Sequence, residues 1–216
     1  MEQKILTEQQ TLVLDLVSKE PELQNFYLSG GTALAAFHLE HRFSDDLDFF
    51  TPDTVDIVFL RSFVETIQYE LVATTTEFQR LHDRNLFTFM LPDNELKIEF
   101  TIYPFPQFEN PSIRENIKID SFRDIAANKL AALLDRFEPK DFADMYFILQ
   151  KTSLEHVWHD TEKKFGMQID PMFLGSELAK VRRIEALPRM IKPLTKEELR
   201  QFFTEEAKKL SPSILL

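Results

Sequence analysis

Two of the four glycines in this 216-residue chain stand side by side, at Gly30 and Gly31. The segment Asn25–Leu28 before them is aromatic and suits a short strand, and Thr32–His41 after them begins with good helix formers. A glycine pair between a strand and a helix permits positive φ and close backbone approach. Its amides and the helix N-terminus form a site for an anion such as phosphate. A simple strand–helix turn explains the pair equally well when it is taken alone.

Two carboxylates follow in Asp46-Leu47-Asp48, at the start of a second expected strand that runs to Phe50. Strand side chains alternate between faces, so Asp46 and Asp48 point the same way while Leu47 points toward a core. Paired ionised acids on a buried strand repel each other, and a divalent cation relieves this. Mg²⁺ takes one or two carboxylates and completes its shell with water and substrate phosphates. The alternative is a solvent-facing edge strand, because a bare Asp-x-Asp pattern is common by chance.

The glycine pair and the two acids are close in the sequence, so we interpret them as parts of one site. Only 14 residues separate Gly31 from Asp46, so we expect the anion site and the metal site at the same end of neighbouring elements. Arg42 and Ser44 lie just ahead of the acids and are placed to contact a phosphate or a nucleobase. His38 and His41 have no third ligand at metal-binding spacing, so we expect surface or partly buried histidines.

Further charged residues are candidates for the same site. Glu99 lies on the polar side of the alternating segment Leu96–Ile102. Its position predicts either a third metal ligand or an ion pair on a wet sheet face. Lys129 falls inside the apolar stripe of a helix expected over 121–136, so it must reach solvent or meet an anion. A triphosphate is one such anion, and Asp141 or Asp144 is the structural alternative. These two acids share a helix face in its first turn, where a capping role explains them as well.

The remaining pattern indicates an α+β fold, with a small mixed sheet and a helical C-terminal half. Residues 7–19 and 55–70 are expected helices, and 86–91 with 96–103 an expected hairpin. Prolines between 104 and 111 suggest a boundary, so we expect an α/β core over 1–110 and a helical domain over 111–216. The later helices are expected at about 121–136, 139–150, 153–165, 170–185 and 195–209.

The composition narrows the class of protein. There is no cysteine, no apolar run long enough for a membrane span and no signal-peptide pattern in the first ten residues, so we expect a cytoplasmic protein without membrane contact. A net charge of −11 argues against non-specific nucleic-acid binding. Residues 178–216 are basic, which favours either an acidic or nucleic-acid partner or simply a solvated helical surface.

Taken together, these motifs resemble one known family. The segments Gly30–Leu34, His41–Ser44 and Asp46–Phe49, with Asn128–Leu130 and Lys140–Asp144 later, are similar in order and type to the nucleotidyltransferase AbiEii/AbiGii toxins. That family is related to the polymerase-β-like nucleotidyltransferases. The resemblance implies that Asp46 and Asp48 hold Mg²⁺ or Mn²⁺ and that the glycine pair, with Thr32, binds the nucleotide. It also implies that Lys129 and Asp141 or Asp144 are essential.

The sequence therefore predicts transfer of a nucleoside monophosphate from an NTP to an acceptor hydroxyl, with tRNA as one acceptor. Glu99, as a metal ligand, would help to activate that hydroxyl. The resemblance implies a toxin of a toxin–antitoxin or phage-defence system, with a cognate antitoxin as a further partner. Two alternatives stay open: an inactive nucleotide- or partner-binding module of the same fold, and a metal-dependent phosphohydrolase. The glycine–helix element favours transfer, because hydrolysis of a phosphodiester needs no triphosphate cradle.

Overall fold

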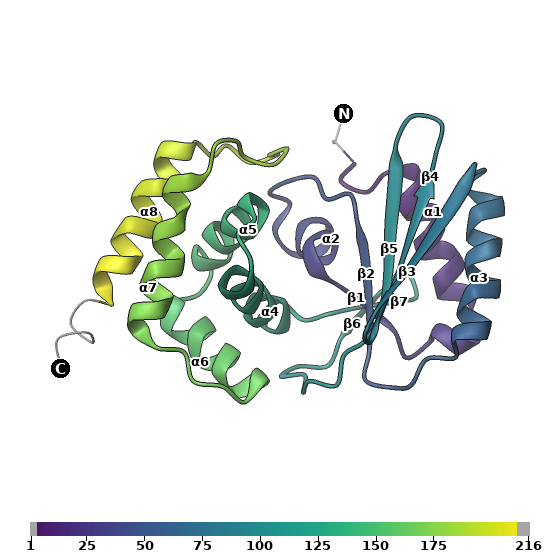
Figure 1. The fold of residues 1–216 in the computed structure, drawn as a ribbon, viewed down its shortest axis with the longest axis horizontal. Coiled ribbons are helices and arrows are strands. Elements are labelled where there is room, and N and C mark those ends of the chain that lie inside the picture. Colours follow the sequence, from purple (N-terminus) through teal and green to yellow (C-terminus); the bar gives the residue numbers. More distant parts are fainter. Residues whose placement is uncertain (1–3, 211–216) are drawn as a thin grey trace. The chain divides into compact units, whose positions relative to one another are not determined.

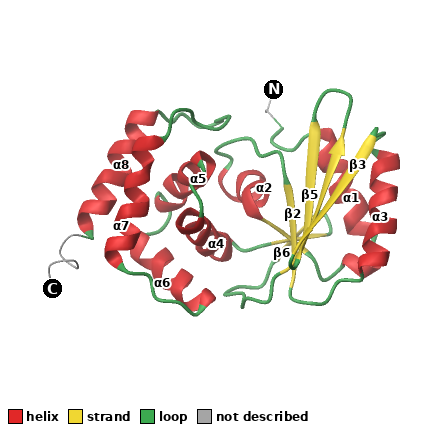
Figure 2. Ribbon diagram, viewed as in Figure 1, coloured by secondary structure: helices red, strands yellow, loops and turns green. Residues whose placement is uncertain are grey.

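The computed structural model describes residues 4–210, which form two compact units. The first unit contains the chain up to His38, Ser44–Pro106 and Asn110–Ser121, and the second contains Leu39–Phe43, Gln107–Glu109 and the chain from Phe122 onward. Figures 1 and 2 show the elements of each unit. The mixed sheet and the helical C-terminal half confirm the predicted α+β class.

A seven-stranded sheet forms the centre of the first unit, with the strand order β3-β4-β5-β2-β1-β7-β6. β2 runs antiparallel to β1 and parallel to β5, so the sheet is mixed. Helices α1 and α3 lie on one side of it and α2 on the other (Figure 1). The strands are β1 (Tyr27–Ser29), β2 (Leu47–Thr51), β3 (Thr75–Leu81), β4 (Arg84–Met90), β5 (Glu95–Ile102), β6 (Ser112–Arg114) and β7 (Ile117–Ile119).

The helices of this unit begin at recognisable caps. Thr7 and Gln10 form a capping box at the start of α1, and Asp56 caps α3. The helix expected over Thr32–His41 begins earlier, at the first glycine, as α2. It continues as a π-helical turn, η2. The bounds are α1 (Glu8–Lys19), the 3₁₀ turn η1 (Pro21–Leu23), α2 (Gly30–Leu34), η2 (Ala35–Leu39) and α3 (Ile57–Glu70).

Five α-helices build the second unit, close to the expected ranges. Pro139 starts α5, Gly166 ends α6 in the left-handed conformation, and a capping box at Thr195 starts α8. Phe142 and Phe203 pack edge to face at 5.3 Å in the core. The bounds are α4 (Phe122–Asp135), α5 (Pro139–Leu149), α6 (Leu154–Phe165), α7 (Pro171–Ala179), the 3₁₀ turn η3 (Lys180–Arg183) and α8 (Lys196–Lys209).

The division between the units differs from the expected boundary at residue 110. β6 and β7 follow that boundary, yet they belong to the first unit because Ile119 of β7 pairs with Leu28 of β1. Residues 211–216 of the expected helical half lie outside the described residues. No helix within 4–210 is long and apolar enough to cross a membrane.

The aromatic core of the first unit centres on Phe100, which is fully buried. Its ring lies 5.4, 5.2 and 6.4 Å from those of Phe26, Phe49 and Phe87. Phe100→Ala leaves a cavity among these rings and should lower the free energy of unfolding by about 3–5 kcal/mol in urea denaturation. Tyr69→Ala, at an aromatic residue that is 81% exposed, is the control and should change it by less than about 0.5 kcal/mol. Equal losses in both variants would contradict this view of the core.

Candidate active site

Three polar side chains from neighbouring strands share one face of the sheet. Ser29 of β1 is the register partner of Asp48 in β2, and Asp48 is the partner of Glu99 in β5. Register partners project to the same side of a sheet, so these residues form a row, here called the acid row. Their neighbours Phe49 and Phe100 face the opposite side and are buried in the core. The predicted alternation of Asp48 with apolar residues is present.

The glycine pair lies directly against this row. Gly30 has φ +68°, and a Cβ atom added to it would lie 2.0 Å from Oδ2 of Asp48. Any side chain at this position would therefore collide with the carboxylate and strain the backbone. The close approach explains why the chain has glycine here, and it brings the predicted phosphate loop into contact with a predicted metal ligand.

The other predicted acid is held through its backbone. The hydroxyl of Thr32, in α2, donates a hydrogen bond to the carbonyl oxygen of Asp46. The side-chain amide of Gln10, in α1, donates to the carbonyl oxygen of Ser44 at 2.8 Å. Thr32 and Ser44, both predicted to bind nucleotide, thus take part in bonds that fix the path of the chain into β2.

Asp120 holds Ser29 of the acid row, and it was not predicted from the sequence. It is buried, and it accepts hydrogen bonds from the Ser29 hydroxyl at 2.7 Å and from the Ser121 amide at 3.0 Å. Its carbonyl oxygen accepts one from Nε2 of His38 at 2.9 Å. The available signal was an acid directly after the strand Ile117–Ile119, at a position that the strand carries into the core. A carboxylate buried there needs hydrogen-bond donors.

Glu99, predicted as a third metal ligand, is engaged by other groups. Its two carboxylate oxygens accept from Nε and Nη2 of Arg84 at 2.8 and 2.6 Å, and Oε1 accepts from the Thr101 hydroxyl at 2.5 Å. The bond to Glu99 raises the pKa of Arg84. The ion-pair alternative for Glu99 is therefore what the structure shows. Arg84 was not singled out in the sequence, since it lies 15 residues away on β4.

The charged residues predicted from the later motifs gather in the second unit. Asp144 accepts from Nε and Nη2 of Arg42 at 2.6 and 2.9 Å and from Nε2 of His41 at 2.7 Å. Lys129 bridges the two acids, with Nζ 2.6 Å from Asp144 and 3.0 Å from Asp141. We call this group the Asp144 cluster; it consists of His41, Arg42, Lys129, Arg136, Asp141 and Asp144.

This arrangement corrects two expectations. Arg42 was expected to contact phosphate or nucleobase, but it is buried and its guanidinium binds Asp144. Lys129 takes the structural alternative, because its ammonium meets the two aspartates. Asp141 also accepts from Nε of Arg136 at 2.9 Å. The two acids therefore do more than cap a helix, and the cluster joins residues about 100 positions apart in the sequence.

The charges of the cluster favour the ionised forms of Lys129, Asp141 and Asp144. Burial alone would raise the pKa of Asp144, but the charges of Lys129 and Arg42 hold it well below its ordinary value. Burial also opposes charge on Lys129, yet attraction to Asp144 and Asp141 raises its pKa. The pKa of His41 is lowered, chiefly by burial, with Arg42 and Lys129 adding to the effect. His41 is therefore neutral beside the ionised Asp144.

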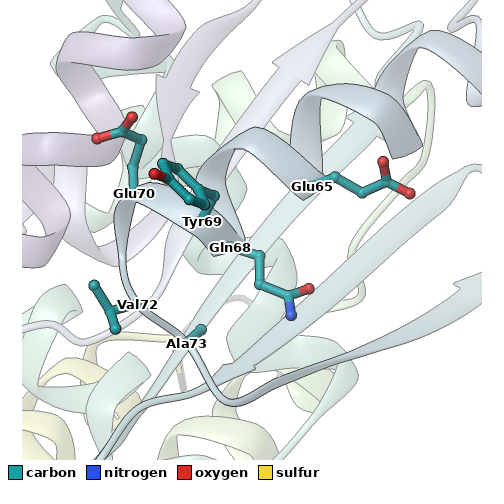
Figure 3. A pocket seen from close by; sticks show the side chains of 6 residues that line it. All are labelled: Glu65, Gln68, Tyr69, Glu70, Val72 and Ala73. Atoms are coloured by element: carbon teal, nitrogen blue, oxygen red, sulfur yellow. The ribbon is translucent and has the colours of Figure 1, made fainter.

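The residues at the acid row fit a magnesium ion in part. Among residues 4–210, no three His, Asp or Glu side chains gather closely enough to ligate one metal. Asp48 supplies a carboxylate against the glycine turn, and Asp46, whose backbone is bonded to Thr32, would supply a second. Mg²⁺ accepts such a pair with waters and phosphate oxygens. A separate hollow lies at the end of α3 (Figure 3); no predicted site residue lines it, and its residues are Glu65, Gln68, Tyr69, Glu70, Val72 and Ala73.

Comparison with known proteins identifies the family of the chain. The family model described as "Nucleotidyl transferase AbiEii toxin, Type IV TA system" matches residues 12–213. A protein of Aquifex aeolicus is 33% identical over 156 residues, covering 71% of this chain and 69% of its own.

Two solved structures share the fold. A candidate nucleotidyltransferase of Helicobacter pylori superposes with a TM-score of 0.61 and 20% identity, over 96% of this chain and 97% of its own. MenT4, a nucleotidyltransferase toxin of Mycobacterium tuberculosis, superposes with a TM-score of 0.51 and 14% identity, over 93% of this chain and 85% of its own.

The two left-handed glycines give a matched test of the contact with Asp48. Gly166 has φ +62° but no atom within 4 Å of an added Cβ, so Gly166→Ala introduces backbone strain alone, about 1 kcal/mol. Gly30→Ala adds the collision and should lower the free energy of unfolding by about 1–3 kcal/mol more. Chemical denaturation of both variants measures the difference. Equal losses would show that Asp48 does not lie against the glycine.

The neutral state of His41 predicts a pH dependence of stability. The unfolded chain binds a proton on this residue near pH 6.5, whereas the folded chain binds it only at lower pH. Stability is therefore lost as the pH falls below 6.5 toward the lowered pKa. His41→Gln should lose less stability than the natural protein between about pH 7.5 and 5.5 in urea denaturation. An unchanged slope would contradict the burial of a neutral His41.

Proposed function

Because the chain belongs to the AbiEii family of nucleotidyltransferase toxins, we propose that it moves a nucleoside monophosphate from an NTP to an acceptor hydroxyl with the help of Mg²⁺ or Mn²⁺. The observation that carries this proposal is the contact between Gly30 and Asp48. It would join a turn proposed to bind phosphate to an acid proposed to bind the metal, within one unit. A nucleoside triphosphate with its cation has this combination of charges.

In the proposed reaction the acceptor oxygen forms a bond to the α-phosphorus, and the bond from that phosphorus to the bridging oxygen breaks. Pyrophosphate leaves with the electron pair, and the hydroxyl proton passes to solvent or a base. Asp46 and Asp48 would hold the cation, which offsets charge on the phosphoryl oxygens. The amides around Gly30 and Gly31 would orient the triphosphate.

The acid row explains why the site favours transfer over the two alternatives. A phosphohydrolase needs acids and a cation but no turn in which a glycine lies against one of the acids to receive a polyphosphate. An inactive binding module does not require both Asp46 and Asp48, and the chain carries both shortly after the glycine pair. Catalysis is therefore the function that we propose, because it uses both the Asp48 carboxylate and the glycine turn beside it.

The partners are proposed from family membership. A transfer RNA is the first acceptor to test, with other hydroxyl-bearing molecules as alternatives, and a cognate antitoxin is expected as the partner that opposes the toxin. An NTP substrate agrees with the cytoplasmic location expected from the sequence. The basic segment expected from the sequence, residues 178–216, would offer compensating charge to an RNA backbone.

The test is incubation of the purified protein with each labelled NTP, Mg²⁺ and total RNA, followed by separation of labelled products. We expect transfer of label to an RNA and release of pyrophosphate. Asp48→Asn should reduce the rate at least about 100-fold because a metal ligand is lost. Asp93→Asn, the same change in the exposed β4–β5 turn, is the control and should leave the rate unchanged.

Three results separate the candidate functions. Release of labelled NMP without an acceptor product would favour the phosphohydrolase. Tight NTP binding without turnover, unaffected by Asp48→Asn, would favour the binding module. Absence of both binding and turnover in a folded protein would contradict the proposal.

A further inference from the structure

We infer that Lys129, Asp141 and Asp144 are positioning residues that hold the segment Leu39–Phe43, and that they do not touch the nucleotide. The inference rests on the proposed function for its kinetic test. It assigns the later sequence motifs to the path of the chain between the glycine pair and the acids.

The carboxylate of Asp144 has no free acceptor position. A carboxylate offers about four lone-pair sites. Oδ1 accepts from Nε of Arg42 and Nε2 of His41, and Oδ2 accepts from Nη2 of Arg42 and lies 2.6 Å from the Lys129 ammonium. The side chain is fully buried. No site is left for a metal ion or a substrate proton, so Asp144 acts through the groups that it holds.

Lys129 is also engaged by protein groups. Its ammonium lies between Asp141 and Asp144, and its side chain is 8% exposed. A triphosphate would have to displace two carboxylates and enter the core of the second unit to reach it. The position of Lys129 inside the apolar stripe of α4 is explained without a ligand, because two buried acids on α5 need a shared cation.

The segment Leu39–Phe43 lies in the sequence between the glycine pair and Asp46. It belongs to the second unit, although the chain before and after it belongs to the first. Besides the side chains of His41 and Arg42, its backbone is held by the loop after η3. The Phe43 amide donates to the Arg189 carbonyl at 2.9 Å, and the amides of Ile191 and Lys192 donate to the His41 carbonyl at 2.8 and 3.0 Å.

The backbone conformation of the segment also depends on contacts from residues outside it. Glu40 has φ +51°, a left-handed conformation that a residue other than glycine keeps only when its surroundings impose it. Phe43 precedes Asp46 by three residues, so a change in its position is transmitted by a very short stretch of chain. Displacements of about 1 Å at a reacting centre reduce rates by about 100-fold.

A compensating pair of substitutions tests the inference. Lys129→Met removes the cation that two acids share, and we expect kcat to fall about 10- to 100-fold while the KM for NTP changes little. Adding Asp141→Asn removes the repulsion between the acids and should restore at least about tenfold of that loss. If Lys129 binds the triphosphate, the double variant stays as inactive as the single one, and both show a raised KM. That result would overturn the inference.

Asp160→Asn is the matched control. Asp160 is a buried acid of the same unit, and its carboxylate accepts two bonds from Arg123, at 2.7 and 2.8 Å, instead of bonds from Leu39–Phe43. This variant should be destabilised like the cluster variants and yet retain the kcat of the natural protein below its melting temperature. A fall in kcat matching that of Lys129→Met would show that loss of stability alone explains the cluster variants.

A measurement on the natural protein decides the question without any variant. An amine-acetylating reagent, read by peptide mass spectrometry with and without NTP and Mg²⁺, should modify exposed Lys163 and leave Lys129 unmodified in both conditions. Modification of Lys129 in the free protein, whether or not NTP protects it, would contradict its burial in the cluster. If no acceptor is ever labelled, the proposed function fails, while this result still decides the place of Lys129.

Discussion

The approach of the Gly30 backbone to the Asp48 carboxylate is the contact on which the rest of the site depends. It is possible only where the residue lacks a Cβ, and it fixes the end of β1 against β2. Thr32 then ties α2 to the backbone of Asp46, and Asp120 anchors Ser29 at the other side of the row. The backbone of the glycine turn and the Asp48 carboxylate therefore meet at one place, where we propose that a nucleotide and its metal ion bind.

The second unit uses buried aspartates for a different purpose. Asp144 fixes the short excursion Leu39–Phe43, and Asp124 fixes Gln107–Glu109 by accepting from the Phe108 and Glu109 amides at 3.0 and 3.2 Å. Each acid has a buried cation, Lys129 or Lys164. Because burying an ion pair contributes little net stability, we interpret both as devices that select one path for the chain. Both are buried acids that accept hydrogen bonds from protein groups.

Sequence patterns predicted those parts of the fold whose signals are local. The hairpin of β4 and β5 followed from Pro92–Glu95 between two alternating runs, and α5 followed from Pro139. β3 was missed because its Thr, Glu, Gln and Arg side chains are largely exposed on an edge strand, and β6 and β7 were hidden after a run of prolines. Pairing of Lys129 with Asp141 or Asp144 was one of two predicted alternatives. The bonds from Arg42 and His41 to Asp144 span about 100 residues, so no spacing rule indicates them.

The most direct measurement is a crystal structure with a non-hydrolysable NTP and Mn²⁺, whose anomalous signal locates the ion. We predict a peak bonded to carboxylate oxygens of Asp46 and Asp48, with phosphate oxygens at the amides of Gly30 and Gly31 and with Lys129 still bound to Asp141 and Asp144. A metal bound elsewhere, or a triphosphate distant from the glycine turn, would contradict the account.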